Sequence, residues 1–136
     1  MTVFSIGYER RSVDELIDIL RTYHVAKLID VRELPLSRRK GFSKSKLSEK
    51  LREAGISYSH IRAAGNPHRA ERADVQRCLR LYRDYLSENP NVVDAVIGEF
   101  GRESVAVLCY EREHECCHRS ILLAGVEERG YRIEAV

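Results

Sequence analysis

Strand-like and helix-like segments alternate along the whole chain, and this alternation most strongly limits how it can fold. Apolar runs typical of buried strands occupy residues 3–6, 26–31 and 104–109, and residues 56–61 form a further predicted strand. Apolar residues at helical spacing occupy residues 12–23, 43–53, 70–87, 92–100 and 118–128, and residues 131–136 form a candidate edge strand. This order predicts an α/β fold with three layers, in which helices cover both faces of a mainly parallel sheet of four to five strands.

The pattern predicts a single domain over residues 1–136. The length is usual for one domain, 43% of the residues are hydrophobic, and neither a linker nor a repeat divides the chain. No apolar run is long enough to span a membrane, and no secretory signal is visible at the N-terminus. Three of the four cysteines crowd together at positions 109, 116 and 117, which favours reduced thiols over disulfides. We therefore expect a cytoplasmic protein without membrane association.

Polar and aromatic residues follow four of the predicted strands. They are Gly7-Tyr8, Asp30-Val31-Arg32, His60 and Cys109-Tyr110-Glu111. The carboxyl ends of parallel strands share one edge of the sheet, and ligands of such sheets bind beyond that edge. The sequence therefore predicts one site that brings these groups together.

The segment between the last buried strand and the last helix holds the densest set of reactive groups. Cys117, His118 and Arg119 are expected in the first turn of that helix, where free backbone N–H groups favour an anion and cationic neighbours favour a thiolate. Cys117, or else Cys109, is then a candidate nucleophile, with His118 or Glu111 as proton carrier. A surface loop followed by a helix with core cysteines fits the same residues, and the sequence leaves both interpretations open.

A metal site competes for this segment, because cysteine and histidine are the common ligands of zinc. The segment has no pair of Cys-x-x-Cys motifs, and the adjacent Cys116 and Cys117 are poorly directed toward one tetrahedral site. We therefore expect neither a metal nor another cofactor.

Asp30 and Arg32 end a buried strand, where charged side chains either face a ligand or pair within a turn. Asp30 is a candidate for orienting Arg32 or His118. Arg32, Ser37 and Arg38 suit the recognition of phosphate or carboxylate, since guanidinium groups bind these anions bidentately.

The net charge of +2 conceals an uneven distribution along the chain. Residues Arg32–Arg72 hold eleven basic and four acidic side chains, a net charge of +7, which leaves twelve basic and seventeen acidic side chains, or −5, elsewhere. This segment predicts a partner that carries phosphate, either a nucleotide or a nucleic acid. A solvated helix face explains the same charges without a partner.

Several short motifs occur in a fixed order along nearly the whole chain. They are Ile6-Gly7-Tyr8, Asp30-Val31-Arg32, Pro35 with Ser37-Arg38, Phe42, Tyr58-x-His60, Gly65-Asn66-Pro67, and Leu108-Cys109-x-Glu111 followed by Cys117-His118-Arg119. The series resembles the domain-of-unknown-function 488 family, and its Cys-x-Glu and Cys-His-Arg end is the most specific part. The chain departs from the family at Ala64, where leucine is usual, and at the extra Cys116.

This resemblance implies a small α/β cytoplasmic domain and supplies no reaction. The family's motif positions fall on Gly7, Tyr8, Asp30, Arg32, Ser37, Arg38, Glu111, Cys117, His118 and Arg119. A more distant similarity to rhodanese-like domains lies in the Asp-x-Arg after a strand and the cysteine loop before a helix. That similarity implies a persulfide-carrying cysteine as an alternative, although the compact glycine-containing loop of rhodaneses is missing.

Three functions are consistent with these patterns: binding or processing of a phosphate-bearing ligand, thiol-dependent catalysis such as sulfur, acyl or phosphoryl transfer, and a non-catalytic interaction module. The candidate catalytic residues are Glu111, Cys117, His118 and Asp30. The candidate ligand-binding residues are Gly7, Tyr8, Arg32, Ser37, Arg38, Cys109 and Arg119. An open pocket containing Arg32, Glu111 and Arg119 would favour the first two functions, and a filled, salt-bridged edge would favour the third.

Overall fold

A five-stranded parallel sheet forms the middle layer of the computed structural model, which describes all residues from 1 to 136. The strands are β1 (Thr2–Gly7), β2 (Lys27–Asp30), β3 (Ser57–His60), β4 (Val105–Cys109) and β5 (Arg132–Ala135). Their order across the sheet is β3-β2-β4-β1-β5, and every neighbouring pair is parallel. The predicted sheet is confirmed, and the C-terminal strand takes the expected edge position beside β1.

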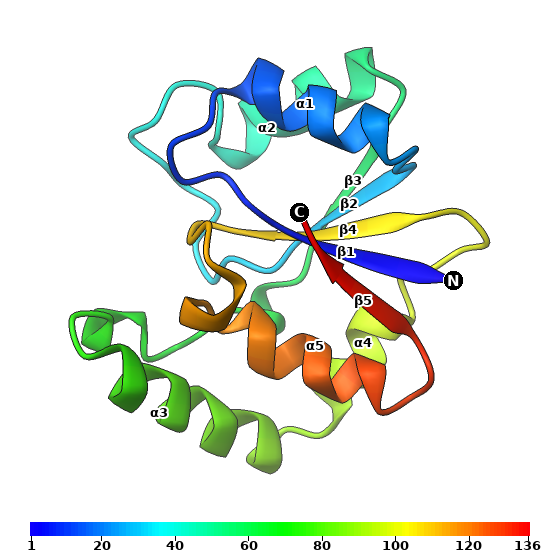
Figure 1. Cartoon of the computed structure of the whole chain (residues 1–136). Coiled ribbons are helices and arrows are strands. Elements are labelled where there is room, and N and C mark those ends of the chain that lie inside the picture. The colour runs from blue at the N-terminus through cyan, green and yellow to red at the C-terminus, as the bar shows by residue number, and fades with distance from the viewer.

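Helices cover both faces of this sheet (Figure 1). One face carries α1 (Val13–Thr22) and α2 (Lys44–Glu53), and the other carries α3 (Val75–Glu88), α4 (Asn91–Ile97) and α5 (Arg119–Glu127). The predicted three-layer α/β architecture is therefore confirmed. None of the helices combines the length and the apolar character that a membrane span requires.

Local capping signals determine where two of these helices begin. Ser12 and Glu15 form a capping box, in which each side chain accepts a hydrogen bond from the other residue's backbone N–H. Asp74 accepts from the backbone N–H of Arg77, so α3 begins at Val75 instead of residue 70 as the periodicity predicted. The residues before Asp74 form a 3₁₀ turn, Arg69–Glu71, which matters for the site below.

Two apolar clusters fill the spaces between the sheet and its helices. Alternate strand residues such as Ile6, Leu28 and Leu108 pack toward α1 and α2. Their neighbours in sequence, including Ile29 and Val107, pack toward the α3–α5 face. Burial on both faces explains why the three central strands, β2, β4 and β1, are mainly apolar in sequence, whereas the edge strands β3 and β5 contain exposed polar residues.

The connections after the strands diverge at the carboxyl edge of the sheet. β1 and β2 lead into α1 and α2 on one face, whereas β4, which lies between them, leads into α5 on the other face. Neighbouring chains that leave in opposite directions open a crevice at this edge, which is where ligands bind in such sheets.

Candidate functional site

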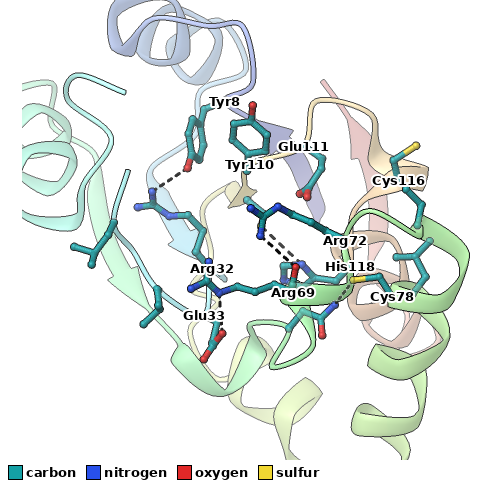
Figure 2. Close-up of a pocket in the computed structure, with 16 residues that line it drawn as sticks. Tyr8, Arg32, Glu33, Arg69, Arg72, Cys78, Tyr110, Glu111, Cys116 and His118 are labelled. Atoms are coloured by element: carbon teal, nitrogen blue, oxygen red, sulfur yellow. Dashed lines mark hydrogen bonds and ion pairs between the residues drawn. The ribbon is translucent and has the colours of Figure 1, made fainter. Parts of the chain in front are cut away.

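A cavity of about 470 Å³ lies at this crevice, beyond the carboxyl ends of β1, β2 and β4. Cys109 and His118 line its deep part, where both side chains are nearly inaccessible to solvent. Tyr8 and Arg32 form part of the wall, and Figure 2 shows how Tyr8, Arg32 and His118 surround a common space. The predicted convergence of the strand ends is met by five residues that line the cavity, Tyr8, Arg32, Cys109, Tyr110 and Glu111. Gly7, Asp30 and His60, which were expected at the same site, do not line it.

The imidazole of His118 touches two thiols at the floor of the cavity. Its Nδ1 lies 3.8 Å from the Sγ atoms of both Cys109 and Cys117. Its Nε2 lies 3.0 Å from the carbonyl oxygen of Val31, which can only accept a hydrogen bond. The Nε2 atom therefore carries the proton, and Nδ1 presents a lone pair to the two sulfurs when the ring is neutral. The edge-on packing of Tyr82 against the ring, with centroids 4.8 Å apart, holds this orientation.

The two thiols differ in their access to the cavity. Cys109 lines the cavity, whereas Cys117 is 1% exposed and lies behind the lining. Burial raises the pKa of the Cys117 thiol well above its usual range, and the neighbouring Cys109 adds to this effect. The expected thiolate at Cys117 is therefore disfavoured, and Cys109 is the thiol that a bound molecule can reach. Cys78 and Cys116 also line the cavity, and all four cysteines are free.

Asp30 and Arg32 form a buried ion pair in place of a ligand-facing acid and base. The Arg32 guanidinium donates from Nε and Nη2 to the Asp30 carboxylate, with the Nη2–Oδ2 distance at 2.7 Å. Tyr58 donates its hydroxyl to the same carboxylate. Burial lowers the pKa of Arg32, but the hydrogen bonds and charge of Asp30 outweigh it, so that the pKa is raised overall. Burial, reinforced by the charge of Asp30, likewise raises the pKa of Tyr58.

This ion pair fixes the wall of the cavity. The remaining nitrogen of Arg32, Nη1, donates to the carbonyl oxygen of Phe42 and to the hydroxyl of Tyr8. The Tyr8 ring in turn stacks on Phe42, with centroids 4.4 Å apart. Asp30 is fully buried and orients Arg32, as the sequence suggested, whereas His118 is oriented by the Val31 carbonyl.

Arg119 does not take part in the cavity. It is fully buried, and it donates from Nε to the Ser5 hydroxyl and from Nη2 to the Glu111 carbonyl oxygen. Its Nη1 has no hydrogen-bond partner. The open pocket expected from the sequence thus contains Arg32 and Glu111 but lacks Arg119, which braces the loop after β4 from beneath.

Two glycines allow the strand-end loops to approach one another closely. A Cβ atom on Gly7 would lie 1.9 Å from the carbonyl oxygen of Glu111. A Cβ atom on Gly65 would lie 2.3 Å from the backbone of Glu33. Gly7, which the sequence predicted as a ligand-binding residue, does not line the cavity, and its missing side chain instead permits the close approach of the loop after β4.

Residues of the 61–79 segment complete the cavity, and the sequence reasoning did not select them. Arg69 pairs with Glu33 at 3.1 Å. Arg72 donates to the Arg69 carbonyl oxygen and has no acidic partner. Asn66 is buried, and its side chain donates to the Cys78 sulfur. The basic run and the Gly65-Asn66-Pro67 motif were the available signals for this wall.

The outer part of the cavity is partly apolar. The exposed side chains of Leu36, Tyr110 and Val75 line it together with the charged ones. Ser37 and Arg38, predicted as anion ligands, lie in the β2–α2 loop and do not line the cavity. Ser37 instead exchanges hydrogen bonds with Ser43 at the start of α2, while Arg38 is exposed.

Comparison with known proteins identifies a family for most of the chain. Residues 12–125 match the family described as Domain of unknown function DUF488. No curated protein and no solved structure matches the chain. The matched range includes α1 to α4, most of α5 and the cavity residues except Tyr8. The chain therefore belongs to the DUF488 family of domains of unknown function.

Proposed function

We propose that this domain binds and processes a phosphate-bearing ligand of the nucleotide class in the cavity at the carboxyl edge of the sheet. One observation carries this proposal: a single cavity joins a guanidinium without an acidic partner, Arg72, to a thiol–imidazole pair, Cys109 and His118. Its volume of about 470 Å³ lies in the range of small-molecule sites.

The charges in the cavity favour one orientation of such a ligand. Arg69 and Arg72 are exposed, so the phosphate fits there, where guanidinium groups can bind it without losing all their hydration. Glu111 also lines the cavity and makes no ion pair, so it would repel phosphate and accept hydrogen bonds from a base or sugar. Figure 2 shows Glu111 and Arg72 directed into the space between these walls.

The apolar lining supports the same class of ligand. Tyr110 packs edge-on against Tyr8, with ring centroids 5.3 Å apart, and presents an exposed aromatic surface at the mouth of the cavity. Leu36 is 72% exposed and lies among the lining residues. A flat, partly apolar base can cover such surfaces, which a free inorganic anion cannot.

Binding measurements with nucleoside monophosphates and short oligonucleotides at low salt test this proposal. Arg72→Gln should weaken binding at least about tenfold, because it removes a charge-assisted hydrogen bond. Arg80→Gln is the matched control, since Arg80 is an exposed arginine on α3 outside the cavity lining. Absence of binding at about 50 mM salt, or equal losses in the two variants, would contradict the proposal.

Substitution of Arg38 distinguishes between a mononucleotide and a nucleic acid as the ligand. This exposed arginine lies outside the cavity lining, so a mononucleotide in the cavity should bind equally well after Arg38→Ala. An oligonucleotide that leaves the cavity along the basic segment should bind more weakly and with a shallower salt dependence.

A thiol-dependent enzyme is the second candidate, because the contact between Cys109 and His118 pairs a nucleophile with a base. It predicts that Cys109 is alkylated rapidly in the folded protein near neutral pH. Peptide mapping by mass spectrometry measures the labelling of each cysteine. If Cys109 reacts only after unfolding, this candidate is excluded.

A further inference from the structure

The floor of the cavity places three metal-binding atoms around one point. The Sγ atoms of Cys109 and Cys117 and the Nδ1 atom of His118 all lie within 4.8 Å of one another. Each sulfur is 3.8 Å from the nitrogen. In a tetrahedral zinc site, the usual Zn–S and Zn–N bond lengths put such sulfur and nitrogen ligands about 3.5 Å apart. Adjustments of a few tenths of an ångström therefore bring each sulfur–nitrogen pair to coordination geometry.

The surroundings of His118 already match those of a metal ligand. Metal-bound histidines commonly donate their second ring N–H to a carbonyl or a carboxylate, which fixes the ring and its tautomer. Here Nε2 donates to the Val31 carbonyl oxygen at 3.0 Å, so the lone pair of Nδ1 points at the two sulfurs. The ring is 8% exposed and packs against Tyr82, which leaves it little freedom to turn away.

We propose that Cys109, Cys117 and His118 bind one Zn²⁺ ion, whose fourth coordination position opens into the cavity. Two thiolates and one imidazole form a ligand set that suits zinc, and three protein ligands with one open position are typical of zinc sites that act on a substrate. The open position follows from the lining, since Cys109 and His118 face the cavity whereas Cys117 lies behind it.

A zinc ion at this position would change the chemistry available in the cavity. A cation at the floor would attract an oxygen of the bound ligand or a water molecule, and it would occupy the Cys109 thiol. The free nucleophile considered above and a zinc site therefore exclude each other. The proposal stands apart from the nucleotide proposal, because the zinc content can be measured without any ligand.

Zinc analysis of the full chain, purified in reductant and dialysed with and without added Zn²⁺, provides the first test. We expect about one Zn²⁺ per chain to remain after dialysis, and Co²⁺ in its place should give the sulfur-to-cobalt charge-transfer absorption and tetrahedral bands of thiolate coordination. Folded wild-type protein that keeps less than about a tenth of an equivalent, and shows no charge-transfer band with Co²⁺, would overturn the proposal.

Single cysteine variants provide the second test, because the chain contains its own controls. Cys109→Ser and Cys117→Ser should each lower the affinity for Zn²⁺ at least about tenfold. Cys116→Ser should not, although Cys116 is adjacent to Cys117 and lines the same cavity, because it lies outside the three-ligand cluster. Far-UV circular dichroism verifies folding, and the Co²⁺ spectrum of the wild-type chain decides the question if a variant does not fold. An equal loss in all three variants would show adventitious thiol binding and overturn the assignment.

Discussion

Replacing Asp30 with asparagine should lower the free energy of unfolding by about 3–5 kcal/mol, the usual cost of removing one partner of a buried ion pair. Asp30 is fully buried and Arg32 is 5% exposed, so the substitution leaves the guanidinium without a counter-charge and away from water. The change also affects the cavity, because the same guanidinium holds the wall that contains Tyr8.

The size of this effect follows from how tightly the pair is held. The Asp30 carboxylate accepts from the backbone N–H, Nε and Nη2 of Arg32 and from the Tyr58 hydroxyl. An asparagine keeps one oxygen and turns an NH₂ group toward these donors. Arg32 cannot escape to solvent easily, because its Nη1 also donates to the Phe42 carbonyl oxygen at 2.6 Å. We therefore expect the full cost of an uncompensated buried charge, not the small cost of a surface pair.

Urea unfolding followed by far-UV circular dichroism measures this difference. The matched control is Asp94→Asn, which removes a short ion pair to Arg129 in which the side chains of Asp94 and Arg129 are 61% and 48% exposed. The control should cost less than about 1 kcal/mol. Replacing both members, with Asp30→Asn and Arg32→Met, should cost clearly less than the sum of the two single changes. A loss below about 1 kcal/mol for Asp30→Asn, or additive losses, would refute the reasoning.

Three further perturbations test other parts of the structure. Gly7→Ala should cost about 1–3 kcal/mol or more, because its Cβ would meet the backbone 1.9 Å away, whereas Gly101→Ala has open space and should leave the thermal midpoint unchanged. Burial, together with the Arg119 charge, lowers the pKa of His114, so folding favours its neutral form. The free energy of unfolding should then decrease as the pH falls from about 7 to 5. His114→Gln should make this decrease smaller, as measured by urea unfolding at each pH. Cys116 is exposed and should be the first thiol alkylated in timed mass spectrometry, and an earlier reaction at buried Cys117 would contradict the burial argument.

The sequence predicted the architecture well because each element carried its own local signal. Apolar runs marked the central strands β1, β2 and β4, which are buried on both faces, and the capping box at Ser12 marked the start of α1. The convergence of Tyr8, Arg32 and Cys109 on one cavity then followed from parallel strands sharing one edge. None of these inferences required knowledge of side-chain directions.

Side-chain direction is where the sequence reasoning reached its limit. His118 and Arg119 are neighbours at the start of α5, yet the first faces the cavity and the second turns beneath the loop to Ser5. Successive residues at a helix start point in different directions, so a run of three functional side chains cannot all face one ligand. The walls formed by Arg69 and Arg72 were missed for a different reason: the periodicity extended α3 over residues 70–74, whereas the Asp74 cap leaves Arg69–Glu71 in a separate turn.

The positions of the charged side chains limit how the basic segment can contact a ligand. Only three of its eleven basic side chains line the cavity, namely Arg32, Arg69 and Arg72. Asp30 neutralises the first and Glu33 pairs with the second, which leaves Arg72 as the one cavity guanidinium without an acidic partner. A mononucleotide held in the cavity should therefore show a shallow salt dependence, corresponding to about one ionic contact. A steep dependence would mean that the ligand extends onto exposed basic residues outside the cavity, such as Arg38, and would identify it as a nucleic acid.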